Sequence, residues 1–382
     1  MLPCQKSRFS LPADEHYLNC AYMSPLSVSV EAAGMTGVAR KRVPSRIATS
    51  DFFTESDRAR ALFARLVNAP DSSRIAIVPS ASYGLAIAAR NLPAARGQNI
   101  VVTDEQFPAN VHAWRRLSRE RGVELRTVAP PPVVEGRGHG WNARLLEAID
   151  RQTAIVALAH LHWTDGTKFD LDAIGRRARE VGAALVIDGT QSVGALPFDV
   201  AAVQPDALIC ATYKWLMGPY SMGMAFLGSR FDDGKPLEET WIGRAGSENF
   251  KDLVNYRDDY QPGALRYDVG ERSNFALMPM VVAALEQVLE WQPARVQQYC
   301  AALTVELFDQ LRALDYTVET PEYRAAHLFG LRAPAGVDIT AVGERLRERK
   351  VFVSLRGSAL RVSPHLYNDG RDIAALVDAL GR

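Results

Sequence analysis

The sequence predicts an α/β fold built on a mainly parallel sheet with helices on both faces. Short apolar runs alternate with helical patterns over the first two thirds of the chain. Two runs, 183–187 and 206–210, are apolar at every position or nearly so, which is typical of strands that are buried on both faces of a parallel sheet. The helix expected over 171–181 carries its apolar residues along one side, as a helix that covers such a sheet requires.

The other elements of this sheet are predicted from the same alternation. A strand at 74–78 leads into a helix from Tyr83, and a strand at 99–103 leads into a helix near 109–122. A further strand is expected at 153–158.

From about residue 280 the alternation gives way to long helical patterns at 279–291 and 296–314, with a few strands. We therefore expect two domains joined through the N-terminal segment. Residues 1–20 would be that segment, 21–280 a large cofactor-binding domain, and 281–382 a smaller α+β C-terminal domain.

Composition limits the classes of function. The 382 residues include 44 Lys plus Arg and 44 Asp plus Glu, and this balance argues against nucleic-acid or anionic membrane partners. No apolar run approaches the roughly 20 residues that span a bilayer, and no signal-peptide pattern follows the first residues. A cytoplasmic protein is therefore expected. The four cysteines show neither zinc-site spacing nor a disulfide framework.

Chemically informative residues follow the strands, where open parallel sheets bind their ligands. Asp188 follows one buried strand and opens Asp-Gly-Thr-Gln-Ser, and Lys214 follows the next in Thr-Tyr-Lys-Trp-Leu-Met. Taken separately, Asp188 is better explained as the cap of a turn or of the next helix, and Lys214 is also consistent with a lysine at a sheet edge. Together they predict one cleft in which a carboxylate pairs with a pyridine nitrogen and a desolvated amine forms a Schiff base.

A phosphate site is a third expectation. The segment Pro79-Ser-Ala-Ser-Tyr-Gly84 follows a strand and opens a helix, whose free N–H groups and positive dipole end attract anions. The hydroxyls of Ser80 and Ser82 would add donors. A simple helix cap is the preferred explanation of this segment when it is considered alone.

These segments resemble the class V aminotransferase family of fold-type I enzymes that use pyridoxal 5′-phosphate (PLP). The family includes cysteine desulfurases, kynureninase and isopenicillin N epimerase. The strongest match runs from Phe169-Asp-Leu through Val-Ile-Asp-Gly-Thr-Gln-Ser-Val-Gly to Thr-Tyr-Lys-Trp-Leu-Met-Gly-Pro. Weaker matches extend from Tyr17-Leu-Asn to Arg361-Val-Ser-Pro-His-Leu-Tyr-Asn. The resemblance implies a mainly parallel seven-stranded sheet and a homodimer whose active sites lie at the subunit interface.

The resemblance also implies a role for each matching residue. Lys214 would hold the cofactor as an aldimine and shuttle the α-proton, and Asp188 would pair with the pyridine nitrogen. Gln191 would bond to the phenolic oxygen, and Phe107 would stack on the ring. Arg361 would bind the substrate carboxylate through a planar guanidinium. The phosphate would be bound by Ser80, Ala81, Ser82 and Tyr213, and from the neighbouring subunit by Ser273 and Asn274.

The sequence departs from cysteine desulfurases in one respect that bears on the reaction. The stretch 353–361 holds no cysteine where those enzymes carry a catalytic one. A lyase of the C–S lyase or kynureninase type that needs no catalytic cysteine is therefore the first expectation. An aminotransferase and an epimerase like isopenicillin N epimerase are the alternatives, and a non-catalytic relative is a further class. No Gly-x-Gly-x-x-Gly follows a strand, which argues against a nicotinamide-dependent dehydrogenase.

Three further residues allow more than one interpretation. Trp163 lies where cysteine desulfurases have an asparagine, and it either resembles the kynureninase aromatic or shapes the substrate pocket. His160 and His162 share a face after a strand, but lack a carboxylate or cysteine at metal-site spacing, so packing near the cofactor is preferred to a metal site.

Overall fold

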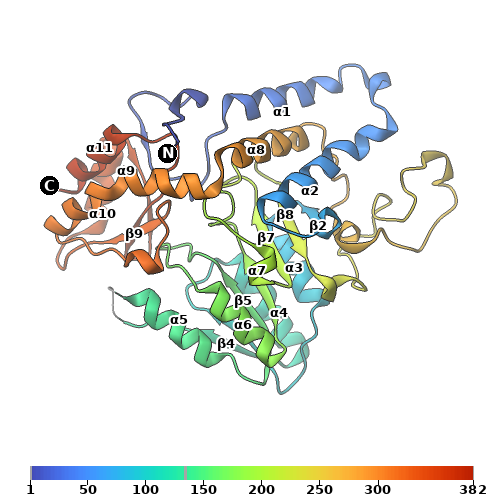
Figure 1. The fold of residues 1–382 in the computed structure, drawn as a ribbon, viewed down its shortest axis with the longest axis horizontal. Helices are drawn as coiled ribbons and strands as arrows, with labels where there is room; N and C mark the ends of the chain where they lie inside the picture. Colours follow the sequence, from blue (N-terminus) through green and yellow to red (C-terminus); the bar gives the residue numbers. More distant parts are fainter. Residues whose placement is uncertain (1, 133–135, 382) are drawn as a thin grey trace.

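A seven-stranded sheet in the order β2-β8-β7-β6-β5-β3-β4 forms the centre of the molecule (Figure 1). The computed structural model describes residues 2–132 and 136–381. Neighbouring strands are parallel from β7 through β4, whereas β8 runs antiparallel to both β7 and β2. The strands are β2 (Ile75–Val78), β8 (Gly223–Leu227), β7 (Ala207–Ala211), β6 (Ala184–Asp188), β5 (Thr153–Ala159), β3 (Asn99–Thr103) and β4 (Glu124–Val128).

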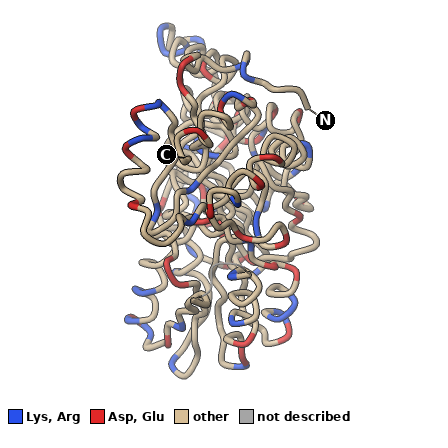
Figure 2. The backbone as a smooth tube through the Cα atoms, turned by 90° about the vertical axis from the view of Figure 1, so that its left-hand side faces the viewer, with Lys and Arg blue, Asp and Glu red and all other residues tan. Residues whose placement is uncertain are grey.

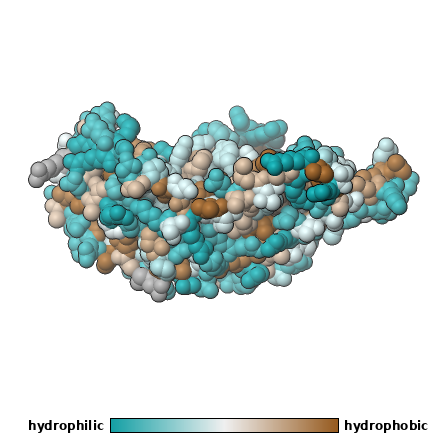
Figure 3. Space-filling model, turned by 90° about the horizontal axis from the view of Figure 1, so that it is seen from above, coloured by the Kyte–Doolittle hydropathy of each residue, from teal (hydrophilic) through white to brown (hydrophobic). Residues whose placement is uncertain are grey.

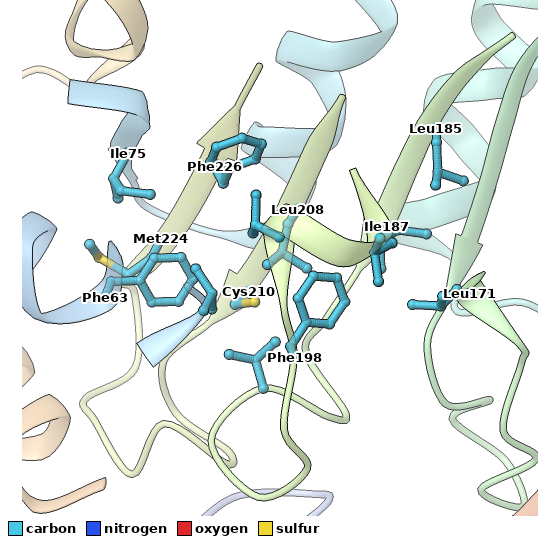
Figure 4. Packing of buried hydrophobic residues seen from close by; sticks show 14 of the residues in the cluster. Phe63, Ile75, Leu171, Leu185, Ile187, Phe198, Leu208, Cys210, Met224 and Phe226 are labelled. Carbon is cyan, nitrogen blue, oxygen red and sulfur yellow. The ribbon is translucent and has the colours of Figure 1, made fainter. Parts of the chain in front are cut away.

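The apolar strands place successive side chains in two separate cores, one on each face of the sheet. Ile187 joins the core beneath α2, α5, α6 and α8, whereas its neighbour Val186 joins the core beneath α3 and α4. Figure 4 shows part of the first core, where side chains from strands and helices meet. The helices are α2 (Thr54–Leu66), α3 (Ala81–Asn91), α4 (Ala109–Arg121), α5 (Arg137–Ala148), α6 (Leu171–Val181), α7 (Val200–Val203) and α8 (Leu277–Trp291).

A smaller part of the molecule lies at one end of this body and is built mainly from the last third of the chain (Figure 1). Its antiparallel sheet has the order β11-β12-β9, and a short parallel pair joins β1 to β10. The N-terminal segment therefore lies against the C-terminal part of the chain. The strands are β1 (His16–Tyr17), β9 (Phe329–Arg332), β10 (Val351–Phe352), β11 (Ser354–Arg356) and β12 (Ala359–Val362), and the helices are α9 (Pro293–Ala313), α10 (Ile339–Glu348) and α11 (Gly370–Leu380).

The remaining helix, α1 (Val28–Arg40), packs along α8 at the edge of the large body (Figure 1). Gly37 allows this close approach, because a Cβ there would lie 2.2 Å from the carbonyl oxygen of Phe275. Beyond the body, Figure 3 shows an extension with hydrophobic surface near its far end. Its segment, 237–262, contains the exposed side chains of Val254 and Tyr256.

The α/β fold predicted from the sequence is confirmed, and the expected helix 171–181 matches α6 residue for residue. Strands β4 and β8 were not predicted. In Figure 2, basic and acidic residues are interspersed along the chain. Within the described residues, none of the helices combines the length and hydropathy needed to cross a membrane. The division into domains at residues 20 and 280 stays a prediction.

Candidate active site

A cavity of about 350 Å³ opens beyond the carboxyl ends of β5, β6 and β7. This is the edge where a parallel sheet leaves room for ligands. Asp188 is the last residue of β6, and Lys214 lies three residues after β7 ends. The lining residues are Pro79, Ser80, Ala81, Ser82, Gln106, Phe107, Ala109, Ala159, Leu161, Trp163, Asp188, Thr190, Gln191, Ala211, Tyr213, Lys214, Tyr220, Ser221 and Met222.

Lys214 is the buried amine of this cavity. The residue is only 7% exposed, and Nζ lies 5.5 Å from the centre of the Phe107 ring and 5.6 Å from that of Tyr213. Burial, followed by the positive charge of Arg361, lowers the pKa of Lys214 to about 8. The neutral, nucleophilic amine is therefore far more populated near neutral pH than it is for an ordinary lysine.

Asp188 is held at the same sheet edge by the backbone of the following turn. Its Oδ1 accepts a hydrogen bond of 3.0 Å from the N–H of Thr190. The hydroxyl of Thr190 in turn accepts a hydrogen bond of 3.2 Å from the N–H of Ala211, at the end of β7. Burial raises the pKa of Asp188, and the charge of Lys214 opposes that rise. A cation placed against this carboxylate would keep it ionised.

The start of α3 forms another wall of the cavity. The Ser80 hydroxyl accepts a hydrogen bond from the N–H of Tyr83, so Ser80 is an N-cap as well as a lining residue. The N–H groups of Ala81 and Ser82 lie in the first turn, where no earlier helical carbonyl is in reach. Gly84 brings this helix against β7, because a Cβ there would lie 2.8 Å from Ile209. The helix end is therefore close to the strand that leads to Lys214 and suits an anion.

Aromatic rings line the outer part of the cavity. Phe107 is 38% exposed and meets Trp163 edge to face, with ring centres 5.4 Å apart. The Trp163 indole N–H donates a 2.7 Å hydrogen bond to the carbonyl of Glu105, which fixes the ring. Glu105 has a left-handed backbone (φ 50°), a conformation that non-glycine residues adopt at some energetic cost. Of the two interpretations of Trp163, the lining position favours the one in which it shapes the pocket.

Gln191 connects the cavity to the N-terminal segment. Its side-chain N–H group donates to the carbonyl of Ala21 at 3.1 Å, and its side-chain oxygen accepts from the indole of Trp215 at 2.9 Å. The second amide hydrogen of Gln191 has no acceptor among the described residues, and Gln191 lines the cavity. The chain can turn closely here because Gly194, at φ 105°, passes the carbonyl oxygen of Trp215 with no room for a Cβ.

Arg361 lies behind Trp163 on β12. It is 1% exposed and donates hydrogen bonds to the Trp163 carbonyl at 2.7 Å and to the Ser354 hydroxyl at 3.4 Å. Its Nε is buried without a partner among the described residues. Burial and the nearby charge of Arg356 lower the pKa of Arg361. Arg361 does not line the cavity itself, although its charge reaches Lys214.

The two residues expected to serve a neighbouring subunit lie away from this cavity. Ser273 is buried, and the side chain of Asn274 accepts hydrogen bonds from Ala276 and Leu277 at the start of α8. Next to them, Asp268 is held between two buried arginines, Arg60 and Arg272, and also accepts from the N–H of Ile77 at 2.8 Å. This ionic cluster, which the sequence patterns did not indicate, anchors the segment that leads into Ser273.

The two histidines after β5 face the helix-covered core. His162 is fully buried, bonds to the Thr164 hydroxyl at 2.7 Å and packs on Trp141. His160 lies against Phe198, and burial lowers its pKa to about 3. Over residues 2–132 and 136–381, no three His, Cys, Asp or Glu side chains gather in a way that could hold a metal ion. These contacts favour the packing interpretation.

The chain belongs to the class V aminotransferase family, whose model matches residues 42–376. An isopenicillin N epimerase of Streptomyces clavuligerus is 23% identical over 85% of this chain and 83% of its own length. A probable cysteine desulfurase of Methanothermobacter thermautotrophicus is 29% identical over 67% of this chain and 61% of its own length.

Solved structures show the same fold. The cysteine desulfurase of Thermococcus onnurineus superposes with a TM-score of 0.85 at 18% identity, covering 100% of this chain and 98% of that one. The cystine C–S lyase C-DES in complex with cysteine persulfide gives 0.83 at 18% identity, covering 97% and 98%. At such identities the likeness establishes the fold and leaves the reaction open.

Proposed function

We propose that this protein is a PLP-dependent enzyme that acts on an amino acid and bonds to its cofactor through Lys214. The observation that carries the proposal is the pairing of a buried amine with a buried carboxylate at the ends of neighbouring strands in one cavity. Family membership supports it, as does a solved structure of the C-DES protein in which glycine is covalently linked to the PLP cofactor. Bound PLP withdraws electrons from the α-carbon of an amino acid and so eases the loss of a proton there.

The residues of the cavity fit such a group. Asp188 has one oxygen left for a protonated ring nitrogen, because only Oδ1 is engaged by the Thr190 N–H. The first turn of α3 offers N–H groups to a phosphate, and the exposed ring of Phe107 offers a flat apolar surface. Gln191 retains an amide hydrogen for the phenolic oxygen. Tyr213 also lines the cavity on the side of Lys214 and would reach the phosphate.

Within this site each side chain has a limited task. Lys214 would hold the cofactor through Nζ, and its amine would move the proton at the substrate α-carbon. Asp188 keeps a proton on the ring nitrogen, because its carboxylate is more stable beside a cation than alone in a buried site. Arg361 holds the substrate carboxylate, and the Trp163 carbonyl fixes the direction of its guanidinium. Phe107 and Trp163 limit the access of water to the reacting carbon.

Among the possible reactions, we favour a lyase of the C–S lyase or kynureninase type that uses no catalytic cysteine. None of the described cavity-lining residues is a cysteine, and Cys20, Cys210 and Cys300 are fully buried. Burial raises the pKa of each of these three thiols, which disfavours the reactive thiolate. An aminotransferase, or an epimerase like isopenicillin N epimerase, is the alternative that the same residues would serve.

A homodimer is part of this proposal. Large apolar side chains are exposed at Tyr22 and Leu26 and along α1 at Val28, Met35 and Val38. Exposed apolar side chains gathered along one helix are typical of a surface that contacts another protein. The segment of Ser273 and Asn274 would supply the neighbouring subunit's phosphate site in such a dimer. Sedimentation or light scattering of the purified protein measures this directly.

The test of the function is an absorbance spectrum of the purified, PLP-loaded protein before and after borohydride reduction, with mass mapping of the product. A visible band that disappears on reduction, together with PLP fixed to the peptide that contains Lys214, is the expected result. A protein that remains colourless and takes up no added PLP would contradict the proposal.

A further inference from the structure

A second arginine lies on the same face of the small sheet as Arg361. In the pairing of β11 with β12, Ser354 lies opposite Arg361, and Arg356 is two residues further along β11. Side chains two apart on a strand share a face, and so do directly opposed residues. The Arg356 side chain therefore emerges on the face of Arg361, whereas Leu355 between them is on the other face and is 38% exposed.

Contacts of Arg356 place its guanidinium beside Trp163, a residue of the cavity wall, although Arg356 does not line the cavity itself. The guanidinium carbon lies 5.6 Å from the centre of the Trp163 ring, and that ring lines the cavity. Among the described residues, the side chain of Arg356 donates one hydrogen bond, to the carbonyl of the adjacent Leu355 at 2.9 Å. Its Nε is buried without a partner within residues 2–132 and 136–381. Most of the donors of this guanidinium thus have no acceptor in the described part of the chain.

The charge balance of this region is strongly positive. Arg356, Arg361 and Lys214 lie within electrostatic reach of one another. Asp188 is the single acidic residue among the described cavity-lining positions, and a bound cofactor would engage it. Neither Arg356 nor Arg361 forms an ion pair with a described carboxylate, whereas Arg332 on the neighbouring β9 pairs with Asp165 at 3.0 Å. Buried or half-buried cations without counter-charges are sites for anionic ligands.

We propose that Arg356 binds a second carboxylate on the substrate side chain, so that the enzyme prefers amino acids that carry two acid groups. This inference rests on the proposed function, because Arg361 must first take the α-carboxylate. Two guanidiniums on one sheet face, one over the indole of Trp163 and one bonded to its main-chain carbonyl, would then bind the two acid groups of the substrate. A substrate with a neutral side chain leaves Arg356 without its acceptor.

The experiment compares ligands that differ by one charge. PLP-loaded protein is titrated with aspartate against asparagine, glutamate against glutamine, and 2-aminoadipate against norleucine. The dissociation constants are measured by calorimetry and by the fluorescence of the tryptophans, so that no turnover is required. The three pairs differ in side-chain length, so the acid that binds most tightly shows which separation of two carboxylates matches the two arginines. The variants are Arg356→Gln, which removes the charge and keeps hydrogen-bonding atoms, and Arg356→Lys, which restores the charge. Arg312→Gln, at an exposed position of α9, is the matched control.

We expect the acid of at least one pair to bind roughly tenfold or more tightly than its neutral partner. Arg356→Gln should remove most of that advantage and leave the neutral partner's affinity nearly unchanged. Arg356→Lys should restore part of it, and Arg312→Gln should behave as wild type.

Two results would overturn the inference, and they differ in what else they affect. Equal affinities within every pair, on protein whose PLP is fixed to Lys214, would exclude the second acid site and leave the proposed function intact. A protein that takes up no PLP on Lys214 would overturn the proposed function, and this inference with it. An acid preference that Arg356→Gln leaves unchanged would also exclude Arg356 as its cause.

Discussion

The Nη1 atom of Arg361 donates a 2.7 Å hydrogen bond to the main-chain carbonyl of Trp163. This contact joins β12 of the small sheet to the loop after β5 of the large one. It fixes a guanidinium and an indole relative to each other, although the two residues are far apart in sequence. The substrate-binding side of the proposed site is therefore assembled from both parts of the molecule.

Replacing Arg361 by alanine should weaken substrate binding more than it lowers the rate of the bound complex. Loss of a charge-assisted pair costs on the order of 1.5–3 kcal/mol, which is a rise of roughly ten- to a hundredfold in KM. Steady-state kinetics on an identified substrate measure KM and kcat separately. An unchanged KM would exclude Arg361 from carboxylate binding.

Lys214→Ala should abolish covalent attachment of PLP and turnover while the fold is kept, because the lysine makes no ion pair in the described structure. Mass spectrometry after borohydride reduction and thermal unfolding measure the two effects. Lys168→Ala is a suitable control, because burial also lowers the pKa of this lysine but it lies outside the cavity. If Lys214→Ala retained covalently bound PLP and Lys168→Ala lost it, Lys168 would be the lysine that bonds to the cofactor.

The stability of the cofactor-free protein should rise with pH between about 8 and 10.5 because of Lys214. In this range the unfolded chain, with an ordinary lysine pKa, binds one more proton than the folded chain, whose Lys214 has a pKa of about 8. Stability rises with pH wherever the unfolded state binds more protons. The free energy of unfolding of wild type, relative to Lys214→Met, should increase by roughly 3 kcal/mol across the range. If the difference in unfolding free energy between the two proteins did not change with pH, Lys214 would have an ordinary lysine pKa.

Asp268→Asn should destabilise the protein by about 3–5 kcal/mol, because it leaves Arg60 and Arg272 buried without their counter-charge. Denaturant unfolding of the cofactor-free protein gives the free energy. Asp309→Asn is the matched control, since its ion pair with Arg312 is exposed, and a change of less than about 1 kcal/mol is expected. Similar losses of unfolding free energy in both variants would show that the buried cluster stabilises the protein no more than an exposed ion pair does.

Iodoacetamide should alkylate Cys4 alone in the native protein, because the other three cysteines are buried and their thiols stay protonated. Turnover of an identified substrate should survive this treatment. Peptide mapping of the modified protein checks the first statement. Rapid modification of Cys20 with loss of activity would instead indicate a catalytic thiol.

Local patterns were sufficient to predict the strands that are apolar on both faces, and with them the positions of Asp188 and Lys214. They did not indicate β4, whose residues are mostly polar or partly exposed at the sheet edge. They also did not indicate β8, which reverses direction after the Lys214 loop and inserts between β2 and β7. Such an insertion depends on pairing between distant segments, and hydrophobic periodicity carries no information on that pairing.

The outer part of the site could likewise be predicted from the sequence only in part. Ser80, Ala81, Ser82 and Phe107 follow strands or open helices, so their place at the sheet edge could be predicted. Arg356 lies in a short strand that contains both polar and apolar residues. Its proposed role in binding a carboxylate depends on a contact with Trp163, which is distant in the sequence. The Asp268 cluster likewise joins residues about two hundred positions apart. Neither relationship leaves a local signal in the sequence.

The pairing of β1 with β10 sets the order in which a newly made chain can finish this cavity. Ala21, whose carbonyl binds Gln191, follows a segment that is held by residues from the far end of the chain, including the bond from the Ser354 hydroxyl to Asn19 at 2.8 Å. The ribosome makes the N-terminal segment long before it makes these partners. One wall of the cavity is therefore completed only after residues 351–354 have been made, so that a shorter nascent chain would lack a complete cofactor site.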